Sequence, residues 1–237
     1  MGFSHQPNII TDGLVTALDS SDKVSYDGSS VTWVDLSATN NDGTLINGTS
    51  FETGSLVGNN GTLVFDGSND YVQIGQIDCS TYTISMWFNL DSLPGGSNFF
   101  VMIRQGYSPV NYGIYINASG EIHTYGVSST ANHFTNTSVA VGTGAWTNLT
   151  FTKDWTTSKD EIYINGELKY GPTSFSAGSY EFNNSSQSYN FTDIARNVNN
   201  NNSFVDGKIT NCFIYSKILN SQQILQNYNA LKGRFGL

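Results

Sequence analysis

Short segments in which apolar and polar residues alternate recur along the chain, and this alternation is typical of β-strands. The clearest is 81–90, where Tyr82, Ile84 and Met86 share one face and polar residues occupy most of the other. Trp87 lies on that polar face as the exception. A hydrophobic period of two with one polar face predicts strands that are buried on one side only.

Two hairpins follow from turn residues between such segments. Within 112–125, Gly120 is placed where a turn needs a positive φ. Within 161–170, the dipeptide Asn165-Gly166 favours a two-residue turn in which both central residues have positive φ. The more continuous apolar run 98–104 predicts a central strand that is buried on both faces.

Two polar stretches and one helix complete the pattern. Residues 126–145 and 183–203 are rich in Ser, Thr, Asn and Gly, which predicts loops that are either simply solvated or ligand-binding. Apolar residues at helical spacing predict one helix over 221–232, which Asn220 or Ser221 caps and Gly233 ends.

These elements together predict an all-β fold: a two-sheet antiparallel β-sandwich of the jelly-roll type with a short C-terminal helix. With 237 residues and 4 prolines, and without a linker-like tract, the chain is expected to form a single domain, 1–237. Cys79 and Cys212 either pair or are two small buried core residues.

The charge balance is acidic, with 10 Lys and Arg against 19 Asp and Glu and a net charge of −9. Such a surface repels phosphate backbones and anionic lipids, which excludes nucleic acid and membrane as expected partners. The surface is expected to consist of Asn, Ser, Thr and Gly, which suits either a sugar ligand or simply an exposed β-protein. The first residues have neither a basic segment nor an apolar core of the secretion-signal type.

A search for catalytic residues finds no constellation, so the chain is predicted not to be an enzyme. Asp160 and Glu161 are adjacent and therefore point to opposite faces of a strand, where they cannot form the carboxylate pair of a glycosidase. His5, His123 and His133 do not have the spacing of zinc ligands.

Four aromatic residues in or beside polar stretches are the candidate ligand-binding residues, because a sugar ring stacks its apolar face on such side chains. They are Trp87, Tyr107, Tyr112 and Trp155. The alternative is that Trp87 packs under a loop or the terminal helix and that Trp155 shields the 154–159 turn.

Several blocks, taken in order, resemble the laminin-G-like, concanavalin-A-like β-sandwich, of the kind found in virion proteins of marine tailed phages. The matching residues are Trp33, Asp35 and Ser37, then Phe65, Asp66, Gly67, Asp70, Tyr71 and Val72, then 146–151 and 163–166, and finally Phe204, Gly207, Ile209, Ile214, Tyr215, Leu219 and Ile224. The blocks extend over nearly the whole chain. The resemblance is strong for the fold and weak for any particular ligand.

Calcium sites occur among such relatives, and Asp35, Asp66 and Asp70 are the candidate metal ligands here. The alternative is that Asp66 and Asp70 stabilise their own turn. Asn211 replaces an acidic residue that many relatives have, and we therefore expect no cofactor, with calcium as the alternative.

The resemblance implies a non-enzymatic virion surface component, a decoration or fibre-type protein of capsid or tail that is made in the host cytoplasm. Its expected partners are other virion proteins, a host-surface glycan and further copies of itself. A lectin-like module that binds glycans is the alternative function. Residues 1–10 and 233–237 are candidate docking tails, through Phe3, Ile9 and Phe235.

Overall fold

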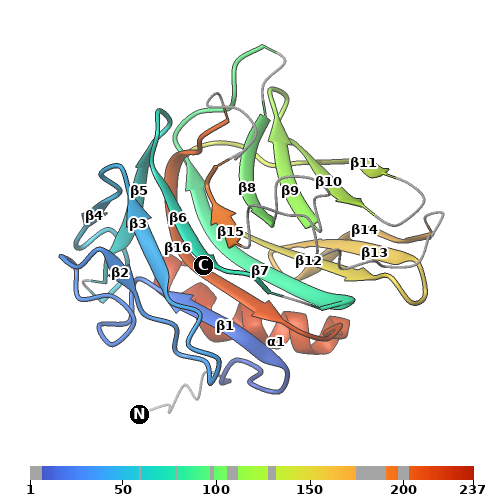
Figure 1. The fold of residues 1–237 in the computed structure, drawn as a ribbon, viewed down its shortest axis with the longest axis horizontal. Helices are drawn as coiled ribbons and strands as arrows, with labels where there is room; N and C mark the ends of the chain where they lie inside the picture. The colour runs from blue at the N-terminus through green and yellow to red at the C-terminus, as the bar shows by residue number, and fades with distance from the viewer. Residues whose placement is uncertain are drawn as a thin grey trace.

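The structure is a computed structural model of the 237-residue chain (Figure 1). It describes residues 7–58, 60–77, 79–96, 99–105, 112–127, 132–174, 191–196 and 203–237. Within these residues the strands form two antiparallel sheets of eight strands each. The predicted all-β sandwich with one short C-terminal helix is confirmed.

The first sheet, sheet A, has the order β14-β13-β12-β7-β16-β5-β4, and β1 pairs with β16 beside β5. Its strands are β1 (Leu14–Asp19), β4 (Ser50–Glu52), β5 (Thr62–Asp66), β7 (Thr81–Leu90), β12 (Thr147–Asp154), β13 (Lys159–Ile164), β14 (Glu167–Ser174) and β16 (Asp206–Tyr215). The long strands β7 and β16 lie side by side at its centre, from Gly207 opposite Leu90 to Tyr215 opposite Thr83.

The second sheet, sheet B, has the order β11-β10-β9-β8-β15-β6-β3-β2. Its strands are β2 (Thr32–Trp33), β3 (Gly43–Ile46), β6 (Tyr71–Gly75), β8 (Phe99–Gln105), β9 (Tyr112–Asn117), β10 (Glu121–Val127), β11 (Asn132–Ala140) and β15 (Phe191–Ile194). The chain crosses repeatedly between the sheets, so that residues far apart in sequence become neighbours, although β8 to β11 are consecutive in sheet B and β12 to β14 in sheet A.

The core fills the space between the sheets, and alternate residues of the regular strands point into it. Ile84, Met86 and Phe88 of β7 are fully buried there, and so are Val72 of β6 and Ile116 of β9. Trp155 joins this core, and Cys212 is buried in it while Cys79 lies at its edge; both cysteines are free thiols.

A second apolar cluster lies on the opposite, outer face of sheet A, beneath helix α1 (Ser221–Leu231). Figure 1 shows α1 lying alongside β1 and β16. Asn220, one of the two predicted caps, is the N-cap, and the structure adds a capping box with Gln223. The predicted stop at Gly233 is wrong, because a 3₁₀ turn (Lys232–Phe235) continues the chain and Gly236 takes the positive φ of 74°.

The two polar stretches are not simply loops. Strand β11 occupies 132–140 of the first, and β15 occupies 191–194 of the second. Both segments become strands of sheet B because they pair with neighbouring strands, β11 with β10 and β15 with β6 and β8. The Asn165-Gly166 turn is confirmed, with φ of 53° and 78°. No helix in the described part of the chain is long and apolar enough to cross a membrane.

Candidate functional site

The outer face of sheet B, opposite the core, carries a row of polar side chains in register across three adjacent strands. On β6, Val72 and Ile74 point into the core, so Gln73 points outward. Gln73 is paired with Asp193 of β15, and Asp193 with Arg104 of β8. We call this outward surface the polar face.

Asp193 is the electrostatic centre of this row. Its Oδ1 accepts a hydrogen bond from Gln73 Nε2 at 3.2 Å, and its Oδ2 lies 3.8 Å from Arg196 Nε. Burial raises the pKa of Asp193 to about 6, against the opposing effects of the Gln73 hydrogen bond and the charges of Arg196 and Arg104. Asp193 and Arg104 are 1% and 4% exposed and lie below the surface, whereas the partly exposed Gln73 and Arg196 carry hydrogen-bond donors at it.

On one side the row continues into an aromatic group. Arg104 is paired with Gly113, Gly113 with Tyr125, and Tyr125 with Phe134. The Tyr115 ring lies over Gly113, where an added Cβ would be 2.5 Å from Tyr115 Cε2, so a side chain at this position would displace the ring.

The rings in this group pack against one another. Tyr115 and Tyr125 meet edge to face at 6.4 Å, and His123 stacks on Phe134 at 5.0 Å. Burial raises the pKa of Tyr115 to about 12, although the charge of Arg104 opposes it. Burial also lowers the pKa of His123 while Glu121 opposes it, which favours the neutral imidazole. Phe134, which is 52% exposed, presents its ring to solvent.

On the other side the row ends at a polar cleft of about 330 Å³. Arg196 stacks on the Tyr71 ring at 4.2 Å and forms one wall. Asn47, Ser68 and Asn69 supply hydroxyl and amide groups around it. This side of the polar face therefore combines a stacked guanidinium with neutral hydrogen-bonding groups, which is a suitable lining for hydroxyl-bearing ligands.

The predicted ligand-binding aromatics are elsewhere. Trp87 is fully buried between sheet A and α1, stacked on Phe235 at 4.0 Å and on Tyr228 at 5.5 Å. Trp155 is buried in the core beneath Lys153, whose Nζ lies 4.8 Å from the ring. A buried ring has no free face on which a sugar can stack. The alternative interpretation, in which Trp87 and Trp155 pack within the protein, is therefore the correct one. Tyr107 lies outside the described residues, and Tyr112, whose side chain is not described, begins β9 opposite Gln105.

The three predicted metal ligands are not brought together. Asp35 accepts hydrogen bonds within its own loop and from Ala17 N. Although burial raises the pKa of Asp35, hydrogen bonds from Ser37, Ala17 and Asn41 outweigh it and hold the pKa below its usual value.

Asp66 and Asp70 stabilise their turn, as the alternative interpretation has it. Asp66 Oδ1 accepts from Ser68 N at 2.8 Å, and Asp70 Oδ2 accepts from Asp66 N at 3.2 Å. Burial and the charge of Asp66 raise the pKa of Asp70. Among the described residues, no group of three or more His, Cys, Asp or Glu side chains is placed to hold a metal ion.

The predicted docking residues that the structure describes are packed on the domain. Ile9 packs against the cluster beneath α1, and Phe235 stacks on Trp87 there. Hydrogen bonds fix the first segment, because Asn227 Oδ1 accepts from Ile10 N and the Tyr215 hydroxyl donates to Ile10 O. Phe3 lies outside the described residues.

Asp160 and Glu161 are separated as predicted. Asp160 is buried and lies 3.6 Å from Lys153 Nζ, whereas Glu161 accepts a hydrogen bond from the Tyr163 hydroxyl. Burial lowers the pKa of Lys153 to about 8, against the attraction of Asp160. This pair is structural, because its members lie in the interior.

Sequence reasoning missed the residues of the polar face. Arg104 lies in the predicted central strand 98–104 without a role, the sequence singles out nothing at Gln73, and Asp193 and Arg196 lie in the stretch 183–203 that is predicted to be a loop. The only signal in the sequence is that charged residues are rare here, at 12% of the chain. An Asp and an Arg within 193–196 of an Asn-rich stretch are therefore unusual.

Comparisons with known proteins concern the fold that carries this site. A family model for the concanavalin A-like lectin/glucanases superfamily matches residues 66–225. No curated protein sequence matches the chain.

Among solved structures, the chain is similar to domain 4 of AbnA, an extracellular GH43 arabinanase from Geobacillus stearothermophilus, solved with arabinotriose. The TM-score is 0.66 at 17% identity, over 92% of this chain and 100% of that one. It is also similar to the binding domain of botulinum neurotoxin serotype D, with a TM-score of 0.66 at 17% identity, over 92% of this chain and 52% of that one. A third is a Trypanosoma rangeli sialidase, with a TM-score of 0.62 at 14% identity, over 93% of this chain and 33% of that one. The chain thus spans about half the length of the toxin domain and a third of the sialidase.

Proposed function

Because the chain belongs to the concanavalin A-like lectin/glucanases superfamily, we propose that it is a non-catalytic carbohydrate-binding domain whose ligand lies on the polar face of sheet B. The observation that supports this proposal most is the in-register row Gln73–Asp193–Arg104 between the aromatic group and the Tyr71–Arg196 cleft. Family membership alone gives the fold and not the ligand.

The chemistry of the row matches that of sugars. A hydroxyl group donates one hydrogen bond and accepts others, and the planar amide of Gln73 and guanidinium of Arg196, both partly exposed, complement vicinal hydroxyls. Exposed rings such as Phe134 supply an apolar surface for the C–H face of a sugar ring. The arabinotriose of the arabinanase domain gives a probe to begin with.

The test is a binding measurement with a glycan panel that includes arabinotriose and sialylated oligosaccharides, followed by titration calorimetry. Arg196→Ala should weaken binding about tenfold, because it removes a charged donor and exposes the Tyr71 ring. Gln222→Ala, a polar and exposed position on α1, is the matched control. Absence of binding across the panel, or equal affinities for the two variants, would contradict the proposal.

Binding should persist in a chelator. The Asp35 carboxylate accepts hydrogen bonds from protein donors, and the Asp66 and Asp70 carboxylates accept hydrogen bonds within the turn 66–70. Titration with and without EDTA should therefore give the same affinity. A loss of binding that added Ca²⁺ restores would instead support the calcium alternative.

We further propose that the domain serves on a virion surface, with host glycan as its ligand. What supports this is the resemblance of 63–75 and 203–237 to appendage domains of tailed phages. Because residues 7–10 and 232–235 pack on the domain, docking through these tails requires that they detach or that another surface is used. Antibody labelling of purified particles tests the role, and unlabelled particles would count against it.

A further inference from the structure

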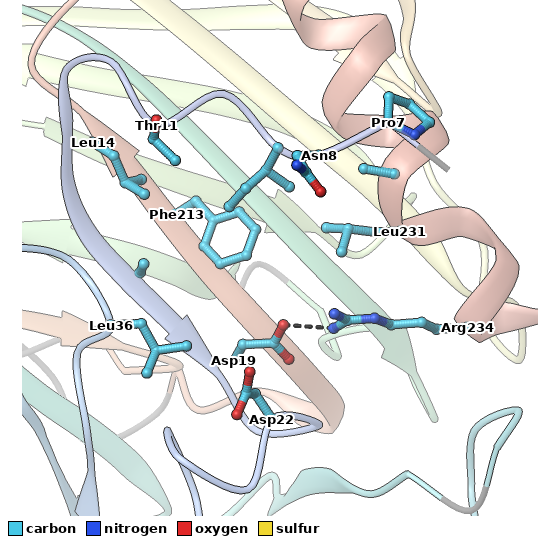
Figure 2. Close-up of a pocket in the computed structure, with 13 residues that line it drawn as sticks. Pro7, Asn8, Thr11, Leu14, Asp19, Asp22, Leu36, Phe213, Leu231 and Arg234 are labelled. Atoms are coloured by element: carbon cyan, nitrogen blue, oxygen red, sulfur yellow. Dashed lines mark hydrogen bonds and ion pairs between the residues drawn. The ribbon is translucent and has the colours of Figure 1, made fainter. Parts of the chain in front are cut away.

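Two buried aspartates of sheet A each form an ion pair with a basic residue, and the two pairs differ in how far water reaches them. The first is shown in Figure 2, at the charged end of a pocket of about 430 Å³, where Arg234 Nη1 donates to Asp19 Oδ2 at 2.5 Å. The Arg234 side chain is 33% exposed, and a guanidinium group does not lose its proton in proteins. This pair therefore remains an ordinary ion pair.

The second pair, Lys153 with Asp160, is closed off from solvent. Lys153 of β12 lies directly opposite Asp160 of β13, and its Nζ is 3.6 Å from Asp160 Oδ2. The exposed fractions of the two side chains are only 1% and 2%. The register of the hairpin therefore holds an amine against a carboxyl group inside the protein.

Aromatic rings surround the amine of this pair. Lys153 lies on the core-facing side of β12 together with Phe151 and Trp155, and its Nζ is 5.9 Å and 4.8 Å from the centres of their rings. On the other side of Lys153, the fully buried Tyr82 of β7 is its partner in the sheet. Such surroundings solvate two ions poorly, so a neutral product is favoured at this position.

Lysine differs from arginine because it can lose its proton and act as a nucleophile. Burial lowers the pKa of Lys153 to about 8, against the attraction of Asp160, which favours the neutral amine. Transfer of one proton within the pair gives an amine beside a carboxylic acid. Because the two strands hold these groups together, their reaction is intramolecular, and effective molarities of well-oriented intramolecular reactions reach about 10⁵–10⁸ M.

We propose that Lys153 and Asp160 condense to an isopeptide bond that joins β12 to β13. The lone pair of the neutral Nζ attacks Asp160 Cγ, and the Nζ–Cγ bond forms as the bond from Cγ to one carboxyl oxygen breaks. That oxygen leaves as water with two of the three protons that the ammonium group carried. The third proton stays on the new amide nitrogen, and no oxidant, reductant or cofactor is needed.

The bond gives the β12–β13 hairpin a covalent closure beside its turn. The two linked residues enclose the turn 154–159, in which Thr156 and Thr157 are exposed. A protease cut between these two residues then leaves both strands attached to each other. The crosslink also restricts the unfolded chain in the way that a disulfide does.

The experiment measures the intact mass of the purified, folded chain, followed by digestion and fragmentation of the peptides in the mass spectrometer. We expect a mass that is one water molecule below the value calculated from the sequence, and a peptide in which residue 153 is joined to residue 160. The matched control within the same molecule is the surface pair Lys217–Asp12, which has the same residue types but side chains that are 31% and 85% exposed. Its peptides should have their full mass.

Two variants remove the nucleophile. Lys153→Arg keeps the positive charge and Lys153→Met keeps the length of the side chain, and both should have the full calculated mass. A wild-type chain of full mass would overturn the proposal, as would a loss of water that persists in Lys153→Arg or that fragmentation assigns to another residue. The wild-type mass and the Lys217–Asp12 control decide the question even where a variant fails to fold.

Discussion

The outer faces of the two sheets have the same strand geometry but different chemistry. On sheet A an apolar cluster on the outer face lies beneath α1, with Trp87 stacked on Tyr228 and Phe235. On sheet B the outward residues form the row Gln73–Asp193–Arg104. The inner faces of both sheets form one shared core. The two sheets therefore differ in what their outer faces do: one packs against α1 and the other carries the polar row.

The contrast between the sheets bears on how a large aromatic residue on the polar side of an alternating strand is interpreted. On sheet A such a residue marks the attachment of a covering element, because burying its ring stabilises the helix contact. On sheet B the rings accompany charged and amide groups, and Phe134 remains exposed. The same pattern in a single strand therefore has two outcomes, which depend on what packs over it.

The largest expected effect is on the covered face. Trp87→Ala removes a fully buried ring that holds both α1 and the C-terminal turn. We expect a loss of about 3–5 kcal/mol in the free energy of unfolding. Urea unfolding monitored by circular dichroism measures it. A loss below about 1.5 kcal/mol would show that α1 is attached by other contacts, and the contrast between the faces would weaken.

The next effect concerns the polar face and pH. The pKa of Asp193 is about 6 in the fold, above its ordinary value, so folding favours the protonated form. The stability from this group is complete below about pH 4 and is lost as the pH rises through 6, by about 2–3 kcal/mol. Asp193→Asn should remove this dependence.

Unfolding free energies of the wild type and Asp193→Asn at pH 4 and pH 7 test this expectation, because other titrating groups cancel in the difference. The variant should gain stability relative to the wild type at the higher pH. A gain at the lower pH instead would mean that the two arginines outweigh burial.

Local signals predict much of this fold. The alternation in 81–90 and the Asn165-Gly166 turn each depend on a few neighbouring residues, and both are confirmed. The helix cap is likewise local, and of the two predicted candidates Asn220 is the N-cap. The sandwich follows, because such strands bury one face only by stacking two sheets.

Nonlocal pairing explains what the sequence could not predict. Strand β15, Phe-Thr-Asp-Ile, has no alternation and is set by β6 and β8 on its two sides. The sequence therefore predicts a loop at Asp193 and does not indicate the central residue of the candidate site. Trp87 had two interpretations because its covering helix lies far along the chain, and no local pattern decides between them.

A smaller effect tests how the hairpin supports the covered face. Gly166 has a φ of 78°, and an added Cβ would lie 3.1 Å from Leu225 Cδ1 and from Tyr228 Cβ of α1. Gly166→Ala should lower stability by about 1–2 kcal/mol through strain and crowding. Thermal unfolding measures it against Gly142→Ala, where an added Cβ meets nothing within 4 Å. Equal melting temperatures would mean that the turn and α1 adjust freely.

The smallest effect on stability is expected at Phe134, the exposed ring of the polar face. Because the ring is 52% exposed, Phe134→Ala should lower the free energy of unfolding by less than about 1 kcal/mol, although the ring contacts His123 and Tyr125. It should nevertheless weaken glycan binding, because a ring that contributes little to folding remains available to a ligand. Urea unfolding and calorimetric titration of the same preparation separate the two effects. A large loss of stability with unchanged glycan binding would mean that Phe134, like Trp87, stabilises the fold and does not contact a ligand. The two outer faces would then differ in their residues but not in what their aromatic rings do.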